Sequence, residues 1–206
     1  GTPEADRYRL ELLAAYEARH SAWLAQITWR PPQLRSARLL LRGFEPSDAE
    51  AIFAYASDAE TTRHMAWDRH ASLRDTQAFL NGWVASSYAT RQLDYAICLI
   101  EQPDRVIGGI GAIAHGERSY QLGYVLAREH WGRGIVPEAA RRLLEQLFRE
   151  TDAQRVFAPI YADNTRSRRT AEKLGMQLDG VLRSACERNG QRKDEAIYSL
   201  LREEWK

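Results

Sequence analysis

The sequence contains few cysteines, almost no net charge and no long apolar run. Only Cys98 and Cys186 occur in 206 residues, so neither a disulfide framework nor zinc-type spacing can be drawn. The net charge of +1 gives no global reason to expect a nucleic-acid or membrane-surface protein. No run approaches membrane-spanning length, and the first residues lack the basic-then-apolar layout of a secretory signal. These absences favour a cytoplasmic protein with no metal and no membrane partner.

The first 33 residues are predicted to form a separate helical extension. Apolar residues recur at helical spacing from about residue 5 to 27, and Pro31 and Pro32 end the pattern. We expect this helix to pack over the main core, with dimerisation or substrate contact as the alternatives. Residues 34–206 are then long enough to form one domain.

The rest of the chain predicts an α/β fold with a mixed, largely antiparallel sheet flanked by helices. Ser47 and Asp48 are candidate caps for a first helix. Ser72 and Asp75 resemble a capping box, which would place Phe79, Leu80, Trp83 and Val84 on one face of a second helix. The expected strands are 37–44, 93–101, 104–114, 118–127, 154–162 and a hairpin at Asn189-Gly190, and the expected helices are 45–57, 72–89, 131–148 and 164–175.

The stretch WGRGIVPEA, from Trp131 to Ala139, places a glycine turn directly before a helix. A helix start offers unpaired N–H groups and the positive end of the helix dipole, and glycines let a phosphate approach the backbone closely. An ordinary tight turn is the alternative. The Walker and Rossmann patterns do not fit, because no Gly-Lys-Ser/Thr follows and a third glycine is absent.

Three segments together resemble the Gcn5-related N-acetyltransferase (GNAT) superfamily, in its branch of ribosomal-protein N-terminal acetyltransferases and small-molecule relatives. The resemblance covers about Leu34 to Trp205 and rests on residues 122–139, 164–176 and 180–205. It implies a six- to seven-stranded sheet and acetyl-CoA as co-substrate, its pantetheine inserted between splayed strands. The cofactor-binding residues that it implies are Val125, Leu126, Ala127, Gly132, Arg133, Gly134, Ile135, Val136, Asn164 and Arg168.

The resemblance also implies direct acetyl transfer to an amine, which needs a proton for the departing thiolate and a base for the amine. Many members carry a tyrosine seven residues after the asparagine, but here that residue is Ala171. Ser167, or a water that it holds, is therefore the expected proton source. Asn164 would bind pantetheine or orient water, and it also suits a helix N-cap.

The base is less clear, because Gln121 stands where relatives often carry glutamate and cannot take a proton. Glu117, His115 and Tyr161 are candidates, and we expect a water relay.

On the acceptor side, the resemblance points to the loop before the second helix, with His64, Trp67 and Tyr161 as candidate substrate-binding residues. Trp67 is either a stacking platform or a loop anchor. His64 and His70 do not have the spacing of a metal site.

The leading hypothesis is an acetyl-CoA-dependent N-acetyltransferase acting on a small amine or a peptide N-terminus. A non-catalytic acyl-CoA-binding module is the alternative, favoured by Gln121 and Ala171. An RNA-associated protein ranks last, because the arginines of 166–169 lack interleaved aromatic residues. The sequence leaves a homodimer open.

Overall fold

Strand residues of this chain alternate between two apolar cores. A computed structural model describes residues 27–188 and 190–206. Leu39 and Leu41 pack into one core, whereas Leu40 between them packs into the other. Successive side chains of a strand point to opposite faces, so this alternation requires a sheet that is covered on both sides.

Within the described residues the sheet has eight strands in the order β1-β2-β3-β4-β5-β6-β8-β7, and of these only β5 and β6 pair in parallel. The predicted mixed, largely antiparallel sheet is confirmed. The short strand β1 adds one strand to the expected six or seven. The strands are β1 (Leu34–Arg35), β2 (Leu39–Arg42), β3 (Leu93–Leu99), β4 (Gln102–Ala114), β5 (Ser119–Leu126), β6 (Arg155–Tyr161), β7 (Gln177–Arg188) and β8 (Gln191–Leu201).

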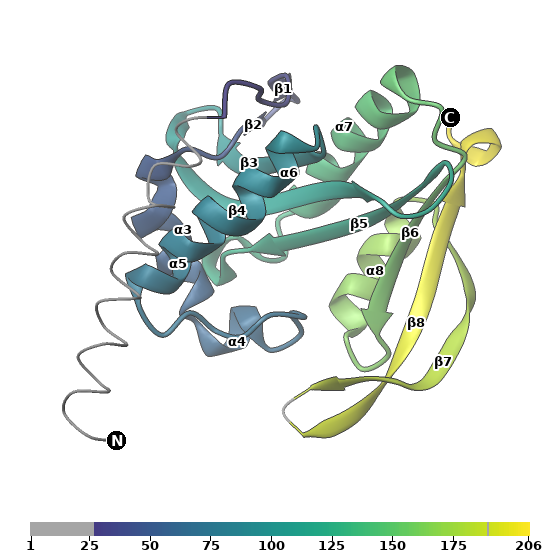
Figure 1. Cartoon of the computed structure of the whole chain (residues 1–206). Coiled ribbons are helices and arrows are strands. Elements are labelled where there is room, and N and C mark those ends of the chain that lie inside the picture. The colour runs from purple at the N-terminus through teal and green to yellow at the C-terminus, as the bar shows by residue number, and fades with distance from the viewer. Residues whose placement is uncertain (1–26, 189) are drawn as a thin grey trace.

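Helices cover both faces of the sheet. Figure 1 shows α3, α5 and α6 on one side, and the apolar contacts place α7 and α8 on the other. The helices are α3 (Ala49–Ala56), α4 (Ala59–Thr62), α5 (Leu73–Phe79), α6 (Ala85–Ala89), α7 (Ile135–Glu150) and α8 (Thr165–Lys173), with short turns η1 (Pro46–Asp48), η2 (Leu80–Val84), η3 (Arg128–His130) and η4 (Arg202–Glu204).

Several local predictions are confirmed. Ser72 and Asp75 form the capping box of α5. Gly175 follows α8 with a φ of +82°, a left-handed conformation that glycine adopts readily. The last two strands form the expected hairpin, in which Arg188 pairs with Gln191. Asn189 and the predicted helix of residues 5–27, apart from Ile27, lie outside the described residues, so that helix stays a prediction.

One predicted helix face is wrong. Leu80 and Val84 are buried, but Trp83 is 58% exposed and its Nε1 donates to Asp94 Oδ2 at 3.2 Å. The cause is η2, a π-helical turn between α5 and α6. A π turn is wider than an α turn, so residues three apart no longer share a face.

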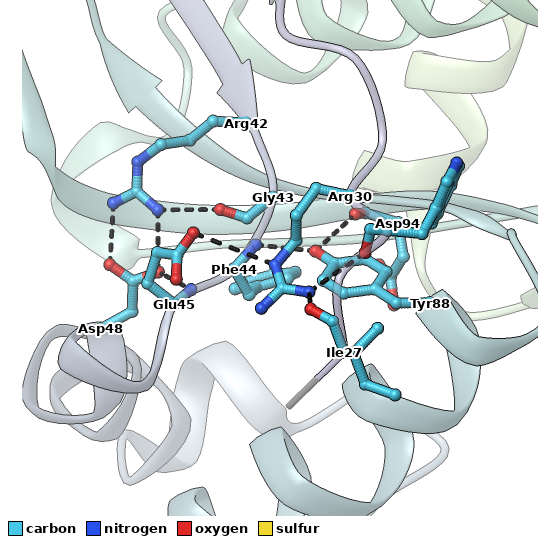
Figure 2. A network of polar contacts seen from close by, with 10 residues as sticks. Ile27, Arg30, Arg42, Gly43, Phe44, Glu45, Asp48, Tyr88 and Asp94 are labelled. Carbon is cyan, nitrogen blue, oxygen red and sulfur yellow. Dashed lines mark hydrogen bonds and ion pairs between the residues drawn. The ribbon is translucent and has the colours of Figure 1, made fainter. Parts of the chain in front are cut away.

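A buried ion pair fastens β2 to the first helical turn, as Figure 2 shows. Two nitrogens of the Arg42 guanidinium donate to the two carboxylate oxygens of Asp48 at 2.8 and 2.7 Å. Asp48 Oδ2 also accepts the N–H of Glu45 at 2.7 Å. Asp48 precedes α3 as the sequence predicts, but its side chain makes no cap hydrogen bond to that helix. It accepts instead from Glu45 at the start of η1 and holds β2 and this turn together.

Candidate active site

Strands β5 and β6 begin as neighbours and then diverge. They pair only where Ser119–Gln121 faces Arg155–Phe157, although both strands continue further. Pro159 lies on β6 beyond the last of these pairs, where it is paired only with β8. A proline has no N–H for a ladder, so it belongs where pairing stops. Figure 1 shows the ends of the two strands apart. The structure therefore has the splayed strands that the resemblance implies.

The glycine corner lies at the open end of this gap, between β5 and α7. Gly132 and Gly134 have φ values of +77° and +71°, and Gly134 is the N-cap residue of α7. Within the described residues, no acceptor is found for the backbone N–H groups from Gly132 to Val136. Unpaired N–H groups at a helix start form an anion site. The corner predicted from the sequence is thus suited to a pyrophosphate.

A clamp that the sequence did not reveal holds this corner. Glu138 accepts hydrogen bonds from Ser36 Oγ at 2.7 Å and from Arg38 Nε at 2.8 Å. Burial raises the pKa of Glu138, but these hydrogen bonds outweigh it and hold the pKa below the ordinary value. Arg38 also donates to the carbonyl of Arg133 at 3.1 Å. The β1–β2 turn thereby fixes the first turn of α7 and the glycine loop.

The residues of β5 whose backbone groups face the gap differ from the predicted pantetheine-binding residues. Ala127 donates its N–H to Ile107 and accepts from His130, so both of its backbone groups have partners. Every second residue of a strand turns its backbone groups to the same edge, so Val125 also faces β4, opposite Gly109. The backbone groups that face the gap belong to Tyr124 and Leu126, and of these the Leu126 carbonyl already accepts from Trp131 Nε1. Of the predicted pantetheine-binding residues, only Leu126 is oriented for it.

Arg166, rather than the predicted Arg168, contacts the glycine corner. Trp131 donates its Nε1 to the carbonyl of Leu126 at 2.8 Å, which fixes the ring. The Arg166 guanidinium lies 3.9 Å from the centre of that ring, a cation–π contact. Arg168 instead donates to the Tyr198 hydroxyl and to the carbonyl of Ala162. Sequence spacing does not show which of these two arginines contacts the corner, because both belong to one short helix.

The start of α8 faces the gap from the other side. Asn164 Oδ1 accepts the N–H of Ser167 at 3.1 Å, so the predicted N-cap is confirmed. The Tyr124 hydroxyl, on β5, donates to the carbonyl of Ser167 at 3.4 Å. Ala171, one turn further along, is 2% exposed. The sequence singled out Asn164 and Ser167 but gave no signal for Tyr124.

The predicted acceptor residues lie near the free ends of the strands. His64 Nε2 lies 3.5 Å from Asp163 Oδ1, and the ring centres of His64 and Tyr161 are 6.4 Å apart. Burial lowers the pKa of His64, although Asp163 acts in the opposite direction, and burial raises the pKa of Tyr161. The structure therefore brings His64 and Tyr161 together.

Trp67 belongs to a loop that is tied to the last hairpin. Arg188 of β7 donates to the carbonyl of Trp67 at 2.8 Å and pairs with Asp68 at 2.5 Å. The Trp67 ring packs 5.2 Å from the His70 ring but stays 36% exposed. Trp67 is thus an anchor with one accessible face.

The candidate bases are separated by the fold. His115 and Glu117 lie at the β4–β5 turn, which is the closed end of the gap, and His115 packs against Phe157. Gln121 occupies the last pair before the strands diverge. Only Tyr161 among the candidates lies near the open end. The sequence alone did not show how far each of these candidate bases lies from the open end of the gap.

Comparisons with known proteins agree with this geometry. The family model described as the acetyltransferase (GNAT) domain matches residues 38–177. An uncharacterized N-acetyltransferase of Bacillus subtilis, YoaA, is 32% identical over 83% of this chain and 97% of its own length. A GNAT-family acetyltransferase structure from Bacillus anthracis has a TM-score of 0.75 at 28% identity, covering 84% of this chain and 99% of that one.

A further similar structure is named RimL, a ribosomal L7/L12 α-N-protein acetyltransferase, in complex with coenzyme A. It has a TM-score of 0.74 and covers 82% of this chain and 98% of that one. Because the sequence identity is only 20%, the likeness concerns the fold alone. Across the part of the chain that the structure describes, no helix is long and apolar enough to cross a membrane.

Proposed function

The chain belongs to the GNAT family of acetyl-CoA-dependent N-acetyltransferases, and on that premise we propose direct acetyl transfer to a primary amine of a small molecule or a protein N-terminus. The observation that carries the proposal is the row of unpaired N–H groups from Gly132 to Val136, beside strands that diverge. These groups would hold the pyrophosphate of acetyl-CoA, and Leu126 and Tyr124 would face its pantetheine.

In this proposal the enzyme holds acetyl-CoA and the acceptor amine together in one complex. The acceptor amine loses a proton to water, and its nitrogen forms a bond with the acetyl carbonyl carbon. The carbon–sulfur bond then breaks, the nitrogen loses its second proton to water as the amide forms, and the sulfur takes up a proton. Placing the two reactants side by side removes much of the entropic cost of their meeting. An α-ammonium has a pKa near ~8, so water can accept its proton near neutral pH.

Two assays test the proposal against a binding module without turnover. Calorimetry with coenzyme A tests the corner, and thioester consumption against a panel of amines and N-terminal peptides tests transfer. Binding without consumption by any amine would favour the binding module, for which Gln121 and Ala171 are the supporting residues. If transfer occurs, reaction with the peptides indicates a protein N-terminus as the acceptor, and reaction with the amines indicates a small molecule.

We expect Ser167→Ala to lower turnover about tenfold while changing the dissociation constant of acetyl-CoA less than twofold. Ser167 lies in the first turn of α8, with its carbonyl beside the Tyr124 hydroxyl of β5, and its hydroxyl would act on the departing sulfur more than on the bound cofactor. Steady-state kinetics and calorimetry measure the two quantities. Thr165→Ala, an exposed position in the same turn, is the control. Equal losses in turnover and affinity would reassign Ser167 to binding.

We expect Trp67→Ala to change the order of preference among acceptor amines and to leave acetyl-CoA affinity unchanged. The exposed face of the Trp67 ring lies on the loop that Arg188 ties to the last hairpin, away from the glycine corner. The amine panel and calorimetry are the measurements. Trp83→Ala, which removes a more exposed ring, is the control. An amine profile identical to the wild type would exclude Trp67 from the acceptor site.

A further inference from the structure

Tyr124 places a hydroxyl group between the two sides of the gap. It lies on β5 beyond Gln121, the last residue of that strand paired with β6. Its side chain lies on the same face of the sheet as Leu122 and Leu126, which is the face that α7 and α8 cover. The hydroxyl reaches α8, where it lies 3.4 Å from the carbonyl oxygen of Ser167. A chain threaded between β5 and β6 would therefore pass this hydroxyl.

The Tyr124 hydroxyl lies against α8, where its neighbours are the carbonyl of Ser167 and the side chain of Thr170. An O–H···O bond is normally ~2.7–2.8 Å long, so the bond at 3.4 Å is weak. Ala171, one turn further along α8, is buried and carries no group that could donate a proton.

The reaction needs a proton donor here whose acidity approaches that of a thiol. Thiols have a pKa of ~8.5 and phenols of ~10, so a phenol can give its proton to a departing thiolate. A serine hydroxyl ionises far less readily, so Ser167 can hold the sulfur or a water but is a poor net donor. Burial raises the pKa of Tyr124, so the phenol is protonated at neutral pH and gives up its proton only as negative charge develops on the sulfur.

We propose that Tyr124 is the catalytic acid that protonates the sulfur of coenzyme A as the acetyl group leaves. The inference rests on the proposed function. As the nitrogen–carbon bond is completed, the carbon–sulfur bond breaks and its electron pair remains on sulfur. The sulfur takes the proton of the Tyr124 hydroxyl. The nitrogen, which gave one proton to solvent before its attack, loses a second proton to water as the amide forms. The tyrosinate regains that second proton through water, so the net products are the amide, the thiol and one proton released from the original ammonium.

The test is Tyr124→Phe, which removes one oxygen atom and keeps the ring. We expect kcat to fall about 100-fold, within the range for loss of a general acid. The calorimetric affinity for coenzyme A should change less than twofold, because the variant keeps the ring and backbone that face the gap. Tyr120→Phe is the matched control, since Tyr120 lies on the same strand and face but in the segment still paired with β6. It should retain the kcat of the wild type.

The outcomes separate the inference from the proposed function. If the wild type transfers acetyl and Tyr124→Phe keeps its kcat, the acid assignment is wrong and the transfer function stands. If Tyr124→Phe loses kcat and affinity in proportion, Tyr124 is a binding residue and the assignment is also wrong. If the wild type binds coenzyme A but transfers acetyl to no amine, the proposed function fails and the assignment fails with it. Thermal midpoints of the variants should match that of the wild type.

Discussion

Gly134→Val is expected to raise the dissociation constant of acetyl-CoA about 100-fold. Gly134 has a φ of +71° and forms the N-cap of α7, where the backbone must approach the phosphates. A β-branched residue resists this conformation, and its side chain would cover the neighbouring N–H groups. Charge-assisted hydrogen bonds contribute ~1.5–3 kcal/mol each, and ~1.4 kcal/mol is a factor of ten, so the loss of one or two accounts for the expected change.

Calorimetry on the folded variant measures this effect, and Gly116→Val separates it from backbone strain. Gly116 has a φ of +75°, and an added side-chain carbon would meet nothing within 4 Å. It lies in the β4–β5 turn, at the closed end of the gap. Both variants should lose similar stability, but only Gly134→Val should lose affinity. Unchanged affinity in a folded Gly134→Val variant would contradict the assignment of the corner.

Asp48→Ala is expected to lower the free energy of unfolding by about 3 kcal/mol. The Asp48 and Arg42 side chains are 2% and 13% exposed. Removing one partner of a buried ion pair leaves the other charge without compensation, at a cost of ~3–5 kcal/mol. The variant also loses the acceptor for the N–H of Glu45. Equilibrium denaturation at constant pH measures the change.

Asp152→Ala is the control for Asp48→Ala. Asp152 accepts from Arg118 Nε at 2.8 Å, but these side chains are 66% and 58% exposed. Solvent screens such a pair, so its loss should not shift the denaturation midpoint measurably. If both variants unfold at the wild-type midpoint, the Arg42–Asp48 pair does not stabilise the fold as its burial implies.

The candidate site was predicted in outline from the sequence, and its details were not. Gly132, Gly134 and the helix after them were found because glycine, proline and helical periodicity act within a few residues. Arg168 was chosen over Arg166 because spacing cannot tell which side of a short helix meets a distant ring. Val125 and Ala127 were included because sequence does not show which edge of a strand is already paired.

Trp83 shows a different limit of prediction from helical spacing. Its spacing from Phe79 predicts a shared helix face, and the π-helical turn moves it to solvent instead. A π turn within a helix is not visible in the spacing of apolar residues, which assumes 3.6 residues per turn throughout. The clamp at Glu138 also lies beyond local patterns, because its partners Ser36 and Arg38 lie about a hundred residues away.

The sequence by itself determined the order of strands and helices, the closing hairpin and the glycine corner, because each depends on hydrogen bonds and side-chain periods within a few residues. The tertiary structure decided how far β5 and β6 stay paired, which bases lie at the closed end, and that Tyr124 meets Ser167. Those features join residues that are far apart in the chain. Their distances are set by the packing of whole strands and helices, which no local pattern encodes.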